Sequence, residues 1–490
     1  MISRESLLLG LDLGTTNIKA YIVTMDGTVV SSGSAAVGIT YAADGTAEQN
    51  LEDIWGGTVT AIRKAVMFAR GANVIAIGVS SQGGALQVLD RGGRCFGPVI
   101  GWQDSRGSSW DRELTARKGG GWFARHTGYP KSTSAVGQLL RLRAQGTLPQ
   151  GFEVGWVGDV IVERLCGRRA HDGTSLSEAC LFNPGENRED GELLEILGVE
   201  RKCLPDLLSV NETAGGLLPD IAQSLSLPAG IPVGPAVHDQ YSAALGSGVV
   251  RSGDTMLGAG TTWALLAITP ELQLPVGGIA LVGCHPVAGL FGQMLSMANG
   301  GACIAWGTRT LNLEAMGVQG TDSCLSSVRP GSDGLRFRPL LSEIGGAGLP
   351  SSAAGCLDGL RLGHTPAHIL RALVEGLACE LGRYLAMMRE GEVPVNRLVM
   401  SGGAAASSVT PGIIADTTGL PVDCMTMPET SSIGAAILAH ALVEPTARLV
   451  DLADSMKPPA RRIEPGQGQP EAHARLEEYL LSCKALKAQP

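Results

Sequence analysis

A strand–turn–strand unit occurs twice in this chain, about half of its length apart, and this repetition constrains the fold most. The first copy has a buried-strand run at residues 7–11, a turn at Gly14-Thr15-Thr16 and a second strand at 18–23. The second copy has strand runs at 252–257 and 263–268, joined by a turn at Gly260-Thr261-Thr262. Two similar units at this separation predict a duplicated architecture.

The length and the order of the patterns extend this prediction to the whole chain. A single hydrophobic core rarely serves 490 residues, so we expect two domains, at 1–247 and 248–490. Strand patterns alternate with helical ones, which predicts the α/β class. A helical stripe follows Pro366, a strand is expected at 397–400, and a terminal helix at 471–486. The stripe consists of Leu370, Leu373, Leu377, Leu381 and Tyr384.

Charge and cysteine usage exclude several classes of protein. Lys and Arg number 38 against 47 Asp and Glu, and no basic run stands out, so nucleic-acid and anionic-membrane partners are disfavoured. The eleven cysteines form no CxxC pair, which indicates reduced thiols. The chain begins directly with a strand-like segment, and no apolar run approaches the ~18 residues that span a bilayer. We therefore expect a cytoplasmic protein.

The first turn carries residues that suit a phosphate group. Backbone amides and hydroxyls of Gly14-Thr15-Thr16 can hold phosphate oxygens, and Asp12, at the end of the preceding strand, can reach an associated Mg²⁺. An ordinary hairpin, whose aspartate bonds its own turn, explains the same residues equally well. No GxxxxGK[ST] loop is present, so this is not a P-loop enzyme.

A second informative stretch is His238-Asp239-Gln240, between a strand-like entry and a helix of small residues. Asp239 could accept the proton of a substrate hydroxyl as that oxygen attacks a phosphorus atom. It could instead be the N-cap of the helix, a common role for aspartate at such a junction. His238 has no metal partner at ligand spacing and is expected to be structural.

These stretches belong to an ordered set of motifs that spans residue 7 to about 440. In this set and this order, the chain resembles the FGGY carbohydrate kinases. The motifs are Asp12-Leu13-Gly14-Thr15-Thr16, Ser81-Gln82-Gly83-Gly84, Trp102-Gln103-Asp104-Ser105-Arg106, His238-Asp239-Gln240, Gly258-Ala259-Gly260-Thr261-Thr262, Asn299-Gly300-Gly301, Arg371-Ala372-Leu373-Val374-Glu375-Gly376, Ser401-Gly402-Gly403-Ala404 and Gly434-Ala435-Ala436.

The resemblance implies two ribonuclease-H-like domains of the actin-like ATPase fold, with ATP in the interdomain cleft. It implies that Asp239 is the catalytic base and that Asp12 and Asp239 lie near Mg²⁺. The implied nucleotide-binding residues are Gly14, Thr15, Thr16, Gly260, Thr261, Thr262, Gly300, Gly402, Gly403 and Ala404, with Ser407 as a further candidate. The implied sugar-binding residues are Gln82, Trp102, Asp104, Arg106 and Gln240.

Three of these sugar-side residues have structural explanations as well. Trp102 could simply belong to a core, and Asp104 with Arg106 could form a surface ion pair of little energetic worth. The resemblance also implies a small sugar or polyol as partner, and it suggests a homodimer.

Departures from the family pattern bear on the substrate. In glycerol kinases the glutamine that matches Gln82 is followed by an Arg-Glu pair that holds the polyol, whereas Gly83 and Gly84 follow here. A tyrosine expected nearby is matched by Ser134, so glycerol is not the expected substrate. Xylulokinases carry Met-His where this chain has the two glycines. A pentulose, a hexulose and a sugar acid all stay open.

Two other classes of protein remain as alternatives. An actin- or Hsp70-like ATPase that acts on a protein partner would share the fold and the phosphate turns. A non-catalytic sugar-binding relative would keep the fold without the reaction. The presence of both Asp12 and Asp239 favours the kinase over the second alternative.

Overall fold

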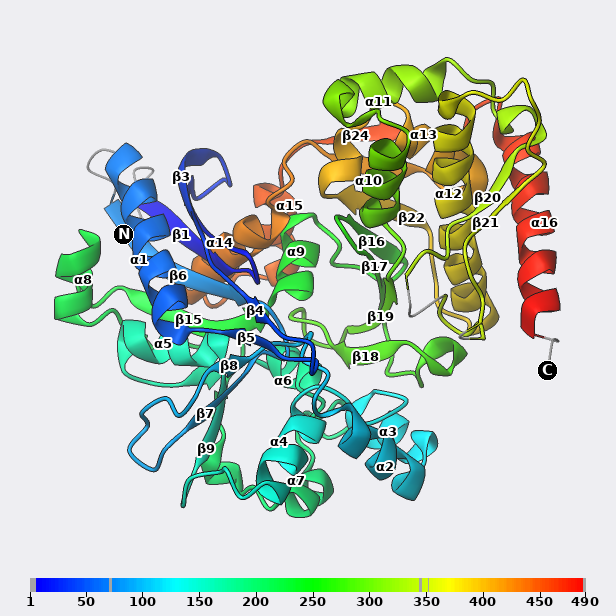
Figure 1. The fold of residues 1–490 in the computed structure, drawn as a ribbon. Coiled ribbons are helices and arrows are strands. Elements are labelled where there is room, and N and C mark those ends of the chain that lie inside the picture. The colour runs from blue at the N-terminus through cyan, green and yellow to red at the C-terminus, as the bar shows by residue number, and fades with distance from the viewer. Residues whose placement is uncertain (1–5, 70–72, 343–345, 351, 488–490) are drawn as a thin grey trace.

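The computed structural model describes residues 6–69, 73–342, 346–350 and 352–487, and it contains two large sheets in two lobes (Figure 1). The first sheet lies in the lobe that contains the blue strands, and the second lies among the green-to-red elements. The prediction drawn from the first residues of the chain falls largely on 1–5, outside the described residues.

The first sheet has the strand order β13-β10-β15-β6-β1-β2-β3, with β14 paired to β15. Strands β1, β2 and β3 form an antiparallel meander, whereas β6, β15 and β10 continue from β1 in parallel. The strands are β1 (Ser6–Leu13), β2 (Asn17–Thr24), β3 (Val29–Ala36), β6 (Asn73–Ser81), β10 (Ala170–His171), β13 (Asp206–Leu207), β14 (Gly215–Gly216) and β15 (Pro232–His238).

The second sheet repeats the central part of this topology, in the order β18-β19-β17-β16-β22-β23-β24. Strands β16, β17 and β19 form the antiparallel meander, and β22 and β23 continue from β16 in parallel. The predicted duplication is therefore confirmed. The strands are β16 (Asp254–Ala259), β17 (Trp263–Thr269), β18 (Leu281–Cys284), β19 (Phe291–Met297), β22 (Arg397–Ser401), β23 (Val422–Met425) and β24 (Ala460–Ile463).

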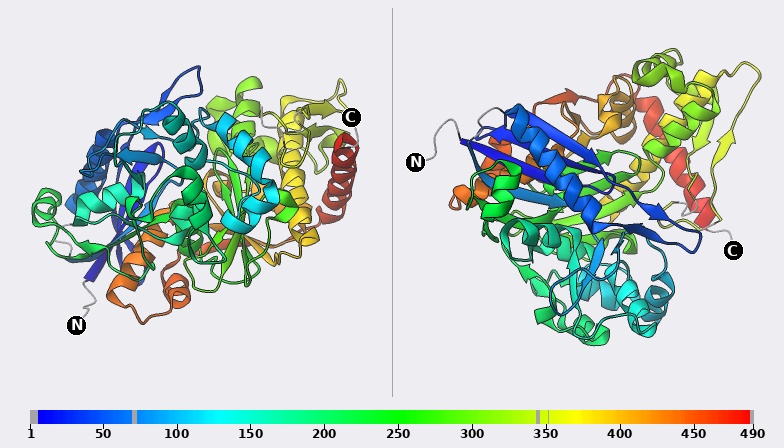
Figure 2. Two further views of the ribbon diagram at one scale, coloured as in Figure 1. Left: turned by 90° about the horizontal axis from the view of Figure 1, so that it is seen from below. Right: turned by 60° about the vertical axis from the view of Figure 1, so that its left-hand side comes forward.

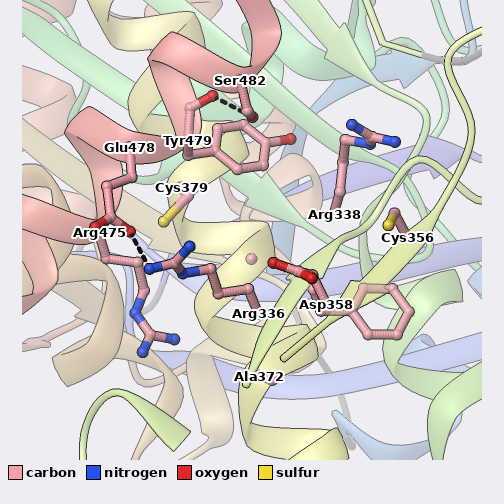
Figure 3. Close-up of a pocket in the computed structure, with 12 residues that line it drawn as sticks. Arg336, Arg338, Cys356, Asp358, Ala372, Cys379, Arg475, Glu478, Tyr479 and Ser482 are labelled. Carbon is pink, nitrogen blue, oxygen red and sulfur yellow. Dashed lines mark hydrogen bonds and ion pairs between the residues drawn. The ribbon is translucent and has the colours of Figure 1, made fainter. Parts of the chain in front are cut away.

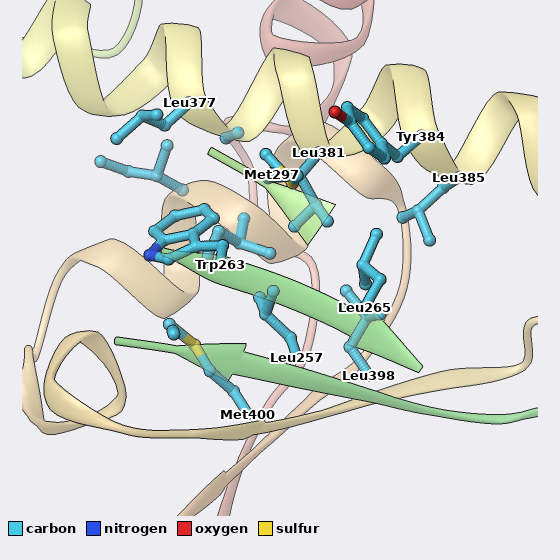
Figure 4. Packing of buried hydrophobic residues seen from close by; sticks show 14 of the residues in the cluster. Leu257, Trp263, Leu265, Met297, Leu377, Leu381, Tyr384, Leu385, Leu398 and Met400 are labelled. Atoms are coloured by element: carbon cyan, nitrogen blue, oxygen red, sulfur yellow. The ribbon is translucent and has the colours of Figure 1, made fainter. Parts of the chain in front are cut away.

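Helix α12 (Pro366–Glu390) covers one face of the second sheet and confirms the predicted stripe. Leu377, Leu381 and Tyr384 point from it toward side chains of β16, β17 and β22 (Figure 4). This contact is the core of the C-terminal lobe. Helix α16 (Gln469–Lys487), the predicted terminal helix, lies beside α12 at the end of the molecule away from the first sheet (Figure 2).

Helix α14 (Thr430–Val443) belongs to the second half of the sequence but packs on the first sheet, between it and α9 (Asp239–Gly246). The contact is backbone to backbone. A Cβ atom on Gly10 of β1 would stand 2.0 Å from the carbonyl oxygen of Ser432. A Cβ atom on the neighbouring Gly78 of β6 would stand 1.9 Å from the carbonyl oxygen of Ala435. The predicted domain division at 247/248 falls in the loop between α9 and β16, and it stays a prediction.

A smaller sheet, in the order β4-β5-β8-β7-β9, adjoins the first one. Its strands are β4 (Thr40–Tyr41), β5 (Ala47–Gln49), β7 (Leu86–Leu89), β8 (Val99–Ile100) and β9 (Glu153–Trp156). Two further pairs of strands stand apart from the sheets: β11 (Phe182–Asn183) with β12 (Arg188–Glu189), and β20 (Arg336–Arg338) with β21 (Cys356–Asp358). The other α-helices are α1 (Leu51–Phe68), α2 (Ser108–Lys118), α3 (Gly120–Thr127), α4 (Ala135–Ala144), α5 (Val157–Cys166), α6 (Gly173–Glu178), α7 (Gly191–Leu197), α8 (Pro219–Leu225), α10 (Gly301–Thr310), α11 (Gly317–Ser326), α13 (Thr410–Thr418) and α15 (Leu449–Met456).

Two predictions from composition can be compared with these elements. All eleven cysteines are free thiols, as expected from their spacing. Among the helices of the described ranges, none has the length and apolar character needed to cross a membrane.

Candidate active site

The parallel strands of the first sheet bring the two predicted catalytic carboxylates to one edge. Asp12, near the end of β1, is in register with Ser80 of β6, and Ser80 is in register with Val237 of β15. Asp239 follows directly after β15. Because the carboxyl ends of neighbouring parallel strands meet at the same edge of a sheet, Asp12 and Asp239 lie close to each other.

The Asp12 carboxylate is buried and shares its surroundings with another acid. It accepts a hydrogen bond of 2.8 Å from the Ser80 hydroxyl on the neighbouring strand, rather than from its own turn. Burial, followed by the nearby charge of Asp239, raises the pKa of Asp12 from 3.8 to about 7. Lys19, whose charge lowers the pKa of Asp12, is already paired with Glu429. Asp12 therefore has unsatisfied capacity for a cation.

Asp239 is the first residue of α9, and it is not the N-cap. The cap position belongs to His238, whose side chain makes no capping bond, so the N-cap alternative for Asp239 is wrong. Burial raises the pKa of Asp239 to about 6, against the opposing hydrogen bonds from Gln240. The His238 Nε2 lies 3.2 Å from Asp239 Oδ1. Burial lowers the pKa of His238, so the imidazole is neutral and can orient the carboxylate.

The second Gly-Thr-Thr turn is held by two glycine-bearing segments. The backbone N–H groups of Gly301 and Ala302 donate to the carbonyls of Gly260 and Thr261, at 3.1 and 2.9 Å. A Cβ atom on Gly402, where φ is +89°, would stand 2.9 Å from the carbonyl carbon of Ala259. Only glycine fits this position without displacing the turn. The structure therefore brings together the turn and the predicted residues at 300 and 402.

The predicted nucleotide-binding residues after Gly402 differ in how accessible they are to a ligand. Gly403 is exposed and Ala404 half-buried, and both lie in a 3₁₀ turn at 403–406 beside the second Gly-Thr-Thr turn. The Ser407 hydroxyl donates to Asp322 Oδ1 at 2.5 Å and accepts the backbone N–H of Thr410 at 2.9 Å. Ser407 is therefore committed to contacts within the protein.

The first turn is linked to the predicted sugar-side residues. Trp102 is 52% exposed and donates from Nε1 to the Thr15 hydroxyl at 3.2 Å, so its assignment to a core is wrong. Gln82 is buried and donates from Nε2 to Gln49 Oε1 at 2.9 Å, and Gln49 donates in turn to the Thr15 carbonyl at 2.9 Å. Gln240 lies near Gly258, whose added Cβ would be 3.5 Å from Gln240 Oε1.

Asp104 and Arg106 form part of a buried network and are not a simple surface pair. The Asp104 side chain is fully buried and accepts from the Ala47 N–H, from Arg106 and from Gln138 Nε2, each at about 3.0 Å or less. Arg106 also pairs with Glu48. Burial favours the neutral form of Asp104, but the bonds from Arg106 and Ala47 hold its pKa below the usual value.

A cavity of about 160 Å³ lies beside these residues. A Cβ atom on Gly84 would be 3.4 Å from the Ser134 hydroxyl and 3.4 Å from the Trp102 Cβ, so this glycine forms part of the wall. The lining is Gly84, Gly101, Trp102, Gln103, Asp104, Ser105, Ser108, Asp111, Thr133, Ser134 and Gln138. Two of the predicted sugar-side residues, Trp102 and Asp104, therefore border a space that a small substrate could enter.

Another hollow, of about 250 Å³, lies in the C-terminal lobe between α12, α16 and the β20–β21 pair (Figure 3). Its polar side chains are largely paired with one another or with the protein. Arg336 pairs with Glu478 at 2.8 Å, and Arg475 pairs with Glu375 at 2.6 Å. None of the predicted site residues lines this hollow, so we do not assign the reaction to it.

Sequence reasoning missed two polar residues of the site. Gln49 bridges Gln82 and the first turn, and Glu178, the last residue of α6, lies next to Gly83 and His238. A single Gln or Glu outside any motif carries no signal in one sequence. Their places follow only from the pairing of β5 with β8 and from the packing of α6.

Comparisons with known proteins agree with this geometry. The models for the N-terminal and C-terminal domains of the FGGY family of carbohydrate kinases match residues 7–246 and 256–442. A glycerol kinase from Thermus brockianus is 30% identical over 448 residues, 88% of each chain. A probable L-xylulose kinase from Pasteurella multocida is 26% identical, over 98% of this chain and 99% of its own. The crystal structure of xylulose kinase from Rhodospirillum rubrum superposes with a TM-score of 0.88 and 24% identity, covering 98% of both chains.

The duplicated sheets and the paired turns therefore define an α/β protein with two domains of the actin-like ATPase fold. The chain belongs to the FGGY family of carbohydrate kinases, and its reaction is the phosphorylation of a sugar or polyol. Family membership sets aside the ATPase that acts on a protein partner.

Proposed function

We propose that Asp239 is the general base that accepts the proton of a sugar or polyol hydroxyl while this oxygen attacks the γ-phosphorus of ATP. One observation carries the proposal: Asp239 begins α9 at the edge of the sheet where Asp12 lies, and the two carboxyl groups influence each other. A pKa of about 6 makes Asp239 a stronger base than an ordinary aspartate, yet leaves it ionised at neutral pH.

The residues around the two turns fit ATP with Mg²⁺. Thr16 and the second turn, 260–262, are exposed, and glycine at 300 and 402 lets the backbone approach a ligand closely. No group of three or more His, Cys, Asp and Glu side chains suited to a metal occurs in the described part of the chain. Mg²⁺ needs no such group, since phosphates, water and one or two carboxylates satisfy it. Asp12 and Asp239 would be those carboxylates, directly or through water.

Bound Mg·ATP would supply the phosphoryl group and neutralise charge on the phosphates. The chain supplies the rest. Asp239 receives the hydroxyl proton, and His238 Nε2 keeps the carboxylate in place. The N–H groups of the two turns would hold the phosphate oxygens. Trp102, Gln82 and Gln240 position the sugar. Closing of the two lobes would exclude water, which Asp239 could otherwise activate.

The test is the isosteric change Asp239→Asn. We expect kcat with the best sugar to fall by roughly 10²- to 10⁴-fold, because the base is lost, whereas the affinity for ATP stays nearly unchanged. ADP release measured against a panel of sugars gives kcat, and calorimetric titration gives ATP affinity. Asp220→Asn, at an exposed site on α8, is the matched control and should retain full turnover. Near-normal turnover in Asp239→Asn would remove Asp239 from the role of base.

A further inference from the structure

Gly84 lines the sugar-side cavity, and its neighbour Gly83 packs against Glu178 and His238. A Cβ atom on Gly83 would stand 2.7 Å from the Glu178 Cβ and 2.6 Å from the His238 ring. No side chain could be added at 83 without moving both neighbours. At Gly84, where φ is +70°, the nearest atoms belong to Ser134, Trp102 and the Glu178 carbonyl, at 3.4 to 3.6 Å. Glu178 thus stands directly behind the two glycines.

Helix α6 holds Glu178 in a fixed place relative to Asp239. The Asp172 side chain caps α6 by accepting the N–H groups of Thr174 and Ser175. The His238 N–H donates to the Thr174 hydroxyl at 2.9 Å, and the Ser175 hydroxyl donates to the carbonyl of Ala236 in β15 at 3.0 Å. The helix and the segment that carries the catalytic base are therefore tied together. The charge of Glu178 acts on His238, and the charge of Asp239 acts on Glu178.

One buried acceptor on this side, Gln82 Oε1, has no donor from the described part of the protein. Gln82 is 4% exposed, and within the described ranges its Oε1 has no hydrogen-bond partner. The cavity lining includes the carboxylates of Asp104 and Asp111 but neither lysine nor arginine. Arg106, the adjacent guanidinium, is bound to both Glu48 and Asp104. A buried acceptor without a donor is costly, so Gln82 Oε1 favours a ligand that brings an O–H group.

From this arrangement we infer that Glu178 is a specificity residue that accepts a hydroxyl of the substrate, and that the acidic wall selects a neutral ketose or polyol over a sugar acid. The inference rests on the proposed function for the location of the sugar. A neutral sugar offers donors to Gln82 Oε1 and to the Glu178 carboxylate. A carboxylate of a sugar acid offers no donor and meets like charges in a partly desolvated space.

The experiment compares D-xylulose, L-xylulose and D-ribulose with D-gluconate, on the wild type and on Glu178→Gln. We expect kcat/KM for the best neutral sugar to exceed that for D-gluconate at least ~100-fold, since like charges in a specificity site cost several kcal/mol. Glu178→Gln should raise KM for the neutral sugar about tenfold, with little change in kcat. The ratio of kcat/KM for the neutral sugar to kcat/KM for D-gluconate should therefore decrease. Glu163 is a half-buried glutamate on α5, so Glu163→Gln is the matched control. It should change neither KM for the neutral sugar nor the preference for this sugar over D-gluconate.

A second measurement separates this inference from the role of Asp239. Sugar affinities are measured by calorimetry on Asp239→Asn protein, alone and combined with Glu178→Gln, so that binding is read without turnover. Loss of neutral-sugar affinity in the double variant supports Glu178 even if Asp239 proves not to be the base. Preference for D-gluconate, failure of every neutral sugar to bind, or unchanged affinity in Glu178→Gln would each overturn the inference.

Discussion

At the scale of single residues, the site keeps two acids in surroundings that oppose their charge. Asp12 is only 7% exposed, and both its burial and the neighbouring Asp239 favour the protonated form. The pKa in the folded chain therefore lies above the value in the unfolded chain, so the folded state binds the proton more tightly. The contribution of Asp12 to the free energy of unfolding therefore falls as pH rises from about 4 to about 7 and stays low above this range.

Asp12→Asn should therefore stabilise the protein without nucleotide while impairing the reaction. The asparagine Oδ1 can still accept the Ser80 hydroxyl, and the buried charge is gone. We expect a gain of roughly 2–4 kcal/mol in unfolding free energy at pH 8 and a smaller gain at pH 5, where the wild-type carboxyl is mostly protonated. Urea unfolding at both pH values measures this difference. A gain that is equal at the two pH values, or a loss at pH 8, would contradict the assignment of the charge.

Residues inside motifs were predictable, and their surroundings were not. Asp12, the two turns and Asp239 stand at strand ends that periodicity alone indicates. The network of Asp104 depends on Glu48 and Gln138, from distant parts of the chain, so a local pattern made it look like a surface pair. Glu178 has no motif at all. The sequence also does not indicate that His238 is the N-cap of α9 and Asp239 its first helical residue, because this depends on the backbone dihedral angles.

At the scale of elements, the packing of α14 on the first sheet depends on glycines. Gly10 and Gly78 are paired across β1 and β6, and the carbonyls of Ser432 and Ala435 lie over them. On the other side of α14, a Cβ atom on Gly434 would stand 1.8 Å from the carbonyl of Ser242 in α9. These contacts leave no space for a methyl group, so α14 fixes the distance between the sheet and the helix that begins with Asp239.

Gly78→Ala should be strongly destabilising because the added methyl group would press α14 away from the sheet. We expect a loss of about 3 kcal/mol or more in unfolding free energy, at the upper end for overpacked cores. The matched control is Gly56→Ala in α1, where a Cβ atom has nothing within 4 Å and alanine should stabilise the helix by roughly 0.5–1 kcal/mol. Thermal and urea unfolding of both variants measure the contrast. Equal stability in the two variants would show that α14 can shift freely.

The order of the helices and strands could be predicted from the sequence, but the surfaces against which they pack could not all be predicted. The predicted hairpins, the stripe of α12 and the strand at 397–400 all appear at the expected positions. These features arise from local periodicity and from turn residues. The attachment of α14 to the first sheet could not be foreseen, because its residues are buried on nearly all sides and no single apolar face indicates which surface it covers.

At the scale of the whole molecule, the two turns come from different lobes and must approach a common ligand. We expect the radius of gyration of Asp239→Asn protein to decrease when a non-hydrolysable ATP analogue, Mg²⁺ and the best sugar are all present, since closure completes the site. Small-angle X-ray scattering measures this change, and the nucleotide analogue alone serves as the control. An unchanged radius with all three ligands would mean that the lobes already have their working arrangement.

The position of α14 also affects how the protein can be made in the cell. The first sheet is complete once residue 246 has been synthesised, yet the helix that covers one of its faces ends only at Val443. At 5–20 residues per second, roughly 200 further residues take about 10–40 s to emerge from a ribosome. During this interval a face that includes Leu8, Gly10 and Gly78 stays bare. The first lobe therefore cannot complete its packing until α14 and α15, from the second half of the chain, have been made.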